Sequence, residues 1–337
     1  MKYKDENFTL DENQPLVLQR YLRKHALITE DESILKMEVP GDGNMNLTLR
    51  VVTDKQSFIV KQSSDFVRKY PTIPAPIGRA LIEAEFYKRV RDLEGVEEFM
   101  PEHLFLDSQN YLQVIEDLGG SSDFTFAYAE DRHLDRDTVN TLMEFLKNLH
   151  SRTRGSESLE NKEMRTLNHE HIFILPFVKN GSIDLDSIHP GLSHVANETI
   201  FKSPLIAETA RELGDVYLST NNHALLHGDF FPGSWLDIKD GIRVIDPEFT
   251  FTGTPEYDLG VFAAHLVLCG WELGEVYEVL DNYGKGDRRL VMGFMATEIL
   301  RRLFGVAQLP ITYSLEKKHQ LAEKALTKLQ LCSNISF

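Results

Sequence analysis

The feature that most constrains the fold is a change from a strand-like to a helical residue pattern at Gly119-Gly120. Before this pair, the segment "ILKMEVPGDGNMNLTLRVVTDKQSFIVKQ" (34–62) is dense in Val, Ile, Leu and Thr and is broken by "PGDGN" and "TDKQ". This pattern predicts three short strands joined by tight connections. The segment "EHLFLDSQNYLQVIED" predicts a further hairpin. Two helices are also expected, over 13–25 with Asn13 as N-cap and over 78–90. Residues 1–118 are therefore predicted to form a lobe built on an antiparallel sheet.

After the glycine pair the pattern is mainly helical. The stretch "DTVNTLMEFLKNLH" has apolar residues at helical spacing behind Asp137, the expected N-cap. Further helices are predicted over 203–219, 256–270, 287–304 and 314–331. Only 225–255 contains short extended pieces. The sequence therefore predicts an α+β chain with two lobes, in which residues 119–337 form a helical lobe.

Charge and composition exclude several classes of function. Lys and Arg number 36 against 52 Asp and Glu, and this net charge of −16 repels nucleic-acid backbones. The excess of acidic residues either keeps the protein soluble or attracts a cationic substrate, and the sequence does not decide between these two roles. No apolar run reaches membrane-spanning length, so no membrane partner is expected. Cys269 and Cys332 provide neither a disulfide framework nor zinc spacing, which favours a cytoplasmic location. A homodimer is left open.

Three carboxylates stand in short motifs of the irregular region. Asp229 lies in "HGDFFPGSWL", and Asp246 and Glu248 lie in "VIDPE". In an extended chain Asp246 and Glu248 face the same way, and two carboxylates beside a turn suit Mg²⁺. Asp229 can orient a hydroxyl or accept its proton. The alternative is that Asp229 and Asp246 are only turn formers.

A lysine on a predicted strand adds to this set. Lys61 ends "SFIVKQ", where apolar neighbours favour burial, and a buried lysine needs a carboxylate such as Glu83 or Glu85 on the next helix. The upstream turn "GDGNMN" can bring backbone N–H groups against phosphates. Taken in order, these parts are those of an enzyme that transfers phosphoryl groups.

The motifs "LLHGDF", "VIDPEF" and "YDLG" resemble those of the aminoglycoside phosphotransferase and choline kinase superfamily, which has a protein-kinase-like fold. Within it, the chain is most similar to the 5-methylthioribose kinase family. The likeness rests on "GDGNMNLTLRV", "VKQ", "RALIEAE", "HGD" followed by "GS" with Ser234 where the superfamily has asparagine, "DPEF", and the arginine pair of "ILRRLFGVA". In place of a tryptophan that this family carries after the strand lysine, the chain has Tyr70-Pro71.

The resemblance implies a set of site residues, with ATP and Mg²⁺ as cofactors. For the nucleotide it implies phosphate binding by Lys61 paired with Glu83, a cover over the triphosphate from Gly41, Asp42, Gly43 and Asn44, and adenine contacts from the backbone of Glu116 and Leu118. For the reaction it implies Asp229 as base and substrate ligand, Asp246 and Glu248 as metal ligands, and Arg301 and Arg302 at the substrate or the transferred phosphate. Asp258 is expected to stiffen the catalytic loop.

The arginine pair can also be weighed by its place on a helix. Arg301 lies seven residues after Phe294, near the apolar face, and an inward arginine needs an anionic partner. That partner is a substrate group or, in a purely structural pair, Glu298 or a carboxylate on another helix.

The sequence therefore predicts a small-molecule kinase acting on a sugar hydroxyl, with 5-methylthioribose or a related small sugar or alcohol as acceptor. Two alternatives remain. One is a kinase of an amine-bearing substrate of the aminoglycoside, choline or homoserine type, which fits the net charge but not an inward arginine pair. The other is a non-catalytic nucleotide-binding scaffold, which would not need Asp229.

Overall fold

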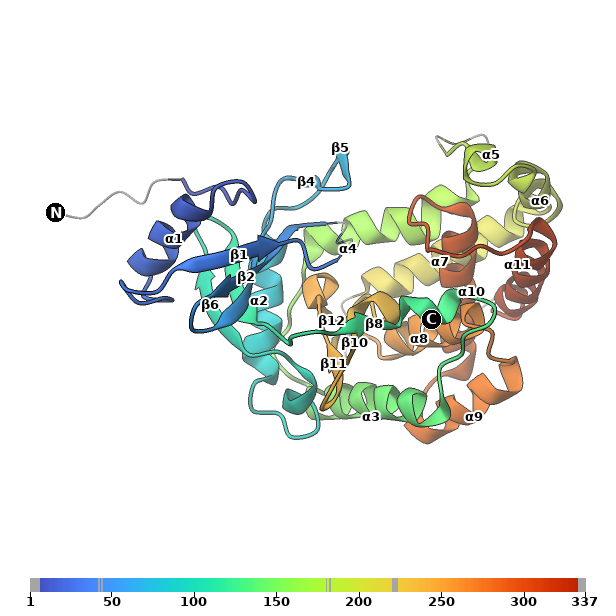
Figure 1. Cartoon of the computed structure of the whole chain (residues 1–337). Coiled ribbons are helices and arrows are strands. Elements are labelled where there is room, and N and C mark those ends of the chain that lie inside the picture. Colours follow the sequence, from blue (N-terminus) through green and yellow to red (C-terminus); the bar gives the residue numbers. More distant parts are fainter. Residues whose placement is uncertain are drawn as a thin grey trace. The chain divides into compact units, whose positions relative to one another are not determined.

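The chain folds into two compact units in this computed structural model (Figure 1). The first, called the sheet unit, comprises the chain up to Asp92 together with Met100–Gly120. The second, called the helical unit, comprises Leu93–Phe99 and the chain from Ser121 onward. The structure describes residues 7–41, 43, 45–179, 181, 183–219 and 224–332.

The sheet unit is built on five antiparallel strands in the order β1-β2-β3-β7-β6. Their bounds are β1 Ile34–Glu38, β2 Leu47–Thr53, β3 Ser57–Gln62, β6 His103–Asp107 and β7 Leu112–Glu116. A separate small hairpin is formed by β4 Phe66–Val67 and β5 Tyr70–Pro74. The predicted run of three strands and the predicted hairpin are both confirmed.

The two helices of the sheet unit are α1 (Pro15–Lys24) and α2 (Arg79–Val90). On β3, the buried Phe58 and Val60 join the core cluster that α1 enters through Leu18 and Leu22. Neighbouring side chains of a strand point to opposite faces, so Lys61 is directed away from this cluster. The expected N-cap of α1 is corrected, because Gln14 occupies that position.

The helical unit contains nine α-helices among the described residues. Their bounds are α3 Arg136–Arg152, α4 Lys162–His169, α5 Leu185–Ile188, α6 Leu192–Glu198, α7 Pro204–Leu218, α8 Glu256–Leu268, α9 Leu273–Tyr283, α10 Arg288–Phe304 and α11 Leu315–Gln330. α8 and α10 form the centre, since nearly all their residues are buried. They pack so closely that a Cβ on Gly260 would lie 2.4 Å from the Cβ of Phe294.

Where the structure describes it, the helical unit also contains five short strands, which form two small sheets. β9 (Ala224–Leu226) pairs with β12 (Phe251–Gly253), with Leu226 opposite Phe251. A second small sheet has the order β11-β10-β8, formed by β8 Ser122–Asp123, β10 Trp235–Ile238 and β11 Gly241–Val244. Because β9 and β12 pair, the loop that follows β9 and the turn that precedes β12 lie next to each other.

The predicted helices of the helical unit are confirmed as α3, α7, α8, α10 and α11. The N-cap of α3 is Asp135, which accepts from the amide of Thr138, and not Asp137 as predicted. The shorter helices α4, α5, α6 and α9 were not anticipated. The sheet unit followed by the helical unit confirms the α+β fold class. In the part of the chain that the structure describes, every helix is too short or too polar to cross a bilayer.

Candidate active site

In the sheet unit, Lys61 makes a buried ion pair with Glu83 of α2. The Lys61 Nζ lies 3.0 Å from Oε1 and 2.8 Å from Oε2 of Glu83, and both side chains are almost fully enclosed. The other candidate, Glu85, pairs instead with Lys88 and Arg89 on its own helix. The strand alternation turns Lys61 away from α1, and the packing of α2 against the sheet presents Glu83, and not Glu85, to it.

The glycine turn before β2 is bound to the rest of the sheet unit by Arg79. This arginine is 1% exposed, and it donates to the carbonyl oxygen of Met45 and to Oδ1 of Asn46, at 2.8 and 2.9 Å. Gly41 and Gly43 have no neighbouring atom within 4 Å of a built Cβ, so they leave open space. Asp42 and Asn44, which were predicted to cover the triphosphate, lie outside the described residues.

The segment predicted to contact adenine follows β7. The amide of Glu116 donates to the carbonyl oxygen of Glu102 at 2.8 Å, so the adenine hypothesis requires the Glu116 carbonyl oxygen. Leu118 lies between Asp117 and Gly119, and Arg50 contacts both of these residues, at 3.0 and 2.7 Å. Arg50 therefore fixes the course of the backbone around Leu118.

In the helical unit, the loop carrying Asp229 is fastened by Asp258 of α8. One carboxylate oxygen of Asp258 accepts from the amide of His227 at 2.8 Å, and the other accepts from the amide of Gly228 at 3.0 Å. His150 of α3 lies 3.0 Å from Oδ2 of the same carboxylate. The carboxylate is fully buried, so it holds the loop with short hydrogen bonds that solvent does not weaken, as the expected stiffening role requires.

Gly228 brings this loop against the turn before β12. Its φ is +87°, and a Cβ there would lie 2.2 Å from the carbonyl oxygen of Phe249. No side chain fits at such a distance, so the glycine allows the two segments to touch. Asp229 and the "DPEF" turn are thereby held side by side.

Ser234 and His227 brace the loop from within. The Ser234 hydroxyl donates toward the carbonyl oxygens of Phe231 and Asp229, at 2.8 and 3.2 Å, and accepts from the Phe231 amide at 3.1 Å. Burial lowers the pKa of His227, so the ring is neutral at pH 7. The neutral ring can donate through Nε2 to the Ile245 carbonyl at 3.1 Å and accept at Nδ1 from the Asp229 amide at 3.4 Å.

Asp246 and Glu248 do not lie on an extended strand, which corrects the geometry assumed for them. β11 ends at Val244, Asp246 has a left-handed backbone with φ of 60°, and Pro247–Phe249 form a 3₁₀ turn. Asp246 is exposed, whereas Glu248 is 5% exposed.

The "DPEF" turn is held by Asn161, whose side-chain amide donates to the carbonyl oxygens of Glu248 and Thr250, at 3.1 and 2.9 Å. Among the described residues, no group of three or more His, Cys, Asp or Glu side chains is placed to hold a metal ion. Two hard carboxylates on one turn still suit Mg²⁺, which completes its shell with water and phosphate oxygens.

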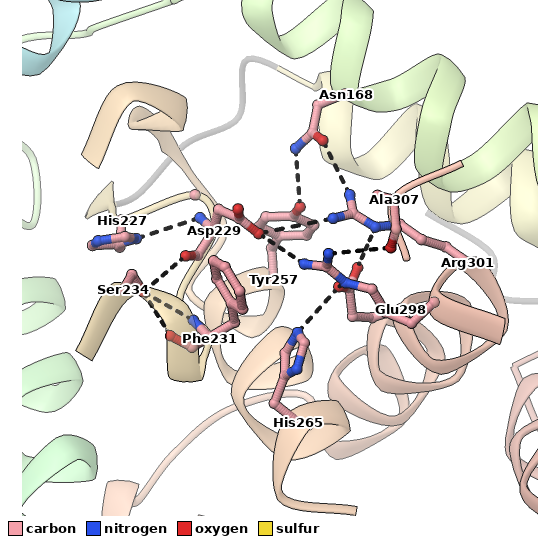
Figure 2. A network of polar contacts seen from close by, with 12 residues as sticks. Asn168, His227, Asp229, Phe231, Ser234, Tyr257, His265, Glu298, Arg301 and Ala307 are labelled. Carbon is pink, nitrogen blue, oxygen red and sulfur yellow. Dashed lines mark hydrogen bonds and ion pairs between the residues drawn. The ribbon is translucent and has the colours of Figure 1, made fainter. Parts of the chain in front are cut away.

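Arg301 and Arg302 both reach Asp229, and Figure 2 shows Arg301 beside that carboxylate. Nη2 of Arg302 lies 3.3 Å from Oδ1 of Asp229, and Nη2 of Arg301 lies 3.8 Å from the same oxygen. Both arginines also pair with Glu298, one turn earlier on α10. The arginines therefore form the structural pair with Glu298 and also face Asp229, the proposed substrate ligand, so the two predicted roles are compatible.

Two further side chains enter this cluster without any local signal in the sequence. Oδ1 of Asn168 accepts from Nη1 of Arg301 at 3.2 Å, and its amide reaches the hydroxyl of Tyr257 at 3.3 Å. His265 of α8 lies 3.3 Å from Oε1 of Glu298. Glu298 itself was detectable from its spacing of three and four residues before the arginines.

Comparison with known proteins identifies the family of the chain. The model of the phosphotransferase enzyme family matches residues 36–294, which is most of the chain. The chain belongs to the phosphotransferase enzyme family. Lys61, Asp229 and Asp246 lie within the matched range, whereas the arginine pair lies beyond it.

Relatives of this phosphotransferase include methylthioribose kinases. That of Geobacillus thermodenitrificans (strain NG80-2) is 28% identical, over 72% of this chain and 63% of that protein. That of Bacillus cereus (strain ATCC 10987 / NRS 248) is 25% identical, over 91% of this chain and 88% of that protein. The match to the first relative therefore spans less than two thirds of that relative's length.

Solved structures share the fold of the phosphotransferase. The choline kinase LicA from Streptococcus pneumoniae gives a TM-score of 0.55 at 13% identity, covering 94% of this chain and 99% of that one. The gentamicin complex of APH(2")-IIa gives 0.53 at 15% identity, covering 96% and 97%. These structures show the shared fold, and the family match and the methylthioribose kinase relatives together with it confirm the resemblance to the aminoglycoside phosphotransferase and choline kinase superfamily.

Proposed function

We propose that this phosphotransferase transfers the γ-phosphoryl group of ATP to a hydroxyl of 5-methylthioribose or a closely related small sugar. The observation that carries the proposal is the Asp229 carboxylate, held on a loop fastened by Asp258 and faced by the Nη groups of Arg301 and Arg302. The methylthioribose kinase relatives support the acceptor.

In this proposal each residue of the helical unit has a defined task. Asp229 accepts a hydrogen bond from the acceptor hydroxyl and takes its proton as the new O–P bond forms and the bond from the γ-phosphorus to the bridging oxygen breaks, releasing ADP. Arg301 and Arg302 donate to the sugar oxygens and offset negative charge on the transferred group. Asp246 and Glu248 hold Mg²⁺, which neutralises phosphate charge when bound.

In the sheet unit, Lys61 binds ATP phosphates, and Glu83 holds the ammonium group in place. The backbone at Gly41 and Gly43 covers the triphosphate, because glycines let backbone N–H groups approach phosphate oxygens. Glu116 and Leu118 bind adenine through backbone atoms. Asp42 and Asn44 complete the same set of proposed nucleotide contacts.

An amine-bearing acceptor is the second candidate, favoured by the net charge of −16. The charges beside Asp229 oppose it. Two arginines face two carboxylates, Asp229 and Glu298, so this cluster has no surplus negative charge to attract an ammonium group. A neutral polyhydroxyl acceptor fits such a cluster better.

The test is a coupled ADP-release assay with methylthioribose, ribose, choline, homoserine and gentamicin as acceptors. Methylthioribose should give the highest kcat/KM, and the Asp229→Ala variant should have a kcat lower by about 10³-fold or more. Faster turnover of choline or gentamicin would assign the chain to the amine-bearing class instead. No turnover with any acceptor, together with a rise in Tm on adding ATP, would indicate a non-catalytic nucleotide-binding scaffold.

A further inference from the structure

Glu298 occupies the position from which both arginines can be oriented at once. It lies on α10, 2% exposed, three residues before Arg301 and four before Arg302. Its Oε1 is 2.6 Å from Nε of Arg302, and its Oε2 is 3.2 Å from Nε of Arg301. Glu298 therefore lies at the Nε edge of both guanidinium groups, as a hydrogen-bond acceptor for Arg302 and as an ion-pair partner for Arg301, and their Nη edges point toward Oδ1 of Asp229. Figure 2 shows Glu298, Arg301 and Asp229 in this cluster.

This arrangement offsets two unfavourable effects of placing arginines side by side. Two like charges packed side by side repel each other in a buried site, and each long side chain has many rotamers. A carboxylate that accepts a hydrogen bond from Nε of Arg302 and forms an ion pair with Nε of Arg301 offsets the repulsion and restricts the rotamers of both arginines. Burial alone would raise the pKa of Glu298, but Arg301 and Arg302 hold it well below its usual range, so the carboxylate is charged.

Behind Glu298 stands a second buried group, His265 of α8. Its Nε2 lies 3.3 Å from Oε1 of Glu298, and its Nδ1 lies 2.6 Å from the hydroxyl of Tyr128. Burial lowers the pKa of His265 to about 4 and raises that of Tyr128 well above its usual range. At pH 7 a neutral ring with a proton on Nε2 can donate to Glu298 and accept from Tyr128 at Nδ1.

We propose that Glu298 and His265 are positioning residues for the acceptor side of the reaction. Glu298 orients the arginine pair toward Asp229, and His265 fixes the carboxylate of Glu298. Neither touches the reacting atoms. The inference rests on the proposed function, because it assigns their effect to binding of the sugar and not of ATP.

The decisive variants are Glu298→Gln and a matched pair at His265. In Glu298→Gln an amide N–H replaces one oxygen and faces an arginine Nε, so the KM for the sugar should rise about tenfold or more while the KM for ATP changes less than about twofold. His265→Gln keeps an N–H near the position of Nε2, whereas His265→Leu removes it. His265→Gln should therefore remain near wild type, and His265→Leu should change the sugar KM as Glu298→Gln does.

Thermal unfolding of each variant shows whether it folds. If Glu298→Gln does not fold, the contrast between His265→Gln and His265→Leu carries the test. An unchanged sugar KM in Glu298→Gln, or equal effects of the two His265 variants, would overturn the positioning role. Wild-type protein without turnover on any acceptor would count against the proposed function, whereas an active wild type with an unaffected Glu298→Gln contradicts only this inference.

Discussion

Replacing Gly228 by alanine tests whether the Asp229 loop and the "DPEF" turn depend on direct backbone contact. The new Cβ would lie 2.2 Å from the carbonyl oxygen of Phe249 and 2.5 Å from its carbonyl carbon. These are backbone atoms, so a change of side-chain rotamer does not relieve the overlap. The residue also has φ of +87°, a conformation that alanine rarely adopts.

The two effects can be separated in magnitude. A left-handed backbone costs an alanine about 1–2 kcal/mol. Forcing an atom into a packed contact adds about 1–3 kcal/mol. Gly228→Ala should therefore lower the free energy of unfolding by about 2–5 kcal/mol. Since the loop must move off the turn, kcat should also fall, by about 10²-fold for a displacement near 1 Å.

Gly155→Ala is the matched control. Gly155 has φ of +74°, and no atom lies within 4 Å of its built Cβ, so only the backbone cost applies. Urea unfolding of both variants, monitored by circular dichroism, gives their free energies of unfolding, and the difference between the two is the cost of the contact with Phe249. The reasoning is refuted if the two free energies of unfolding agree within about 0.5 kcal/mol, the usual scatter of neutral substitutions.

Three further outcomes are expected. Asp229→Ala should lower kcat by about 10³-fold or more because it removes the base, with the Kd for ATP nearly unchanged by calorimetry; retained turnover would remove Asp229 from that role. Glu248→Gln should raise the Mg²⁺ concentration needed for half-maximal rate, and an unaltered Mg²⁺ titration contradicts metal binding by Glu248. His265 favours the folded state only when neutral, so its contribution is lost as pH falls from its ordinary pKa of 6.5 toward its folded pKa of about 4. Wild-type stability should therefore fall more steeply than that of His265→Gln over this range, by up to about 3 kcal/mol, and equal slopes in urea unfolding would contradict the assignment.

The sheet unit was largely predictable because its signals are local. Turn residues separate β1, β2 and β3, and the alternation on β3 that buries Phe58 and Val60 also determines which way Lys61 points. The choice between Glu83 and Glu85 was not local. It depends on the rotation of α2 against the sheet, which packing of the whole unit decides.

Several site contacts in the helical unit could not be predicted from local sequence. The spacing of Asp246 and Glu248 suggested one face of a strand, but β11 ends at Val244, Asp246 takes a left-handed backbone, and Pro247 begins a 3₁₀ turn. His265 reaches Glu298 from α8, and Asn168 reaches Arg301 from α4. Their neighbours along the chain give no sign of it, because tertiary packing alone brings these helices together.

The burial of α10 has a consequence for how acceptor specificity can change. Every residue from Leu290 to Phe304 is buried, so Arg301 and Arg302 are presented by a core helix and not by a loop. Loops tolerate exchange, whereas core positions are coupled to all their neighbours. Redirecting this enzyme to a new acceptor is therefore a problem of core redesign, in which the packing of α8 against α10 has to be recovered together with the new contact.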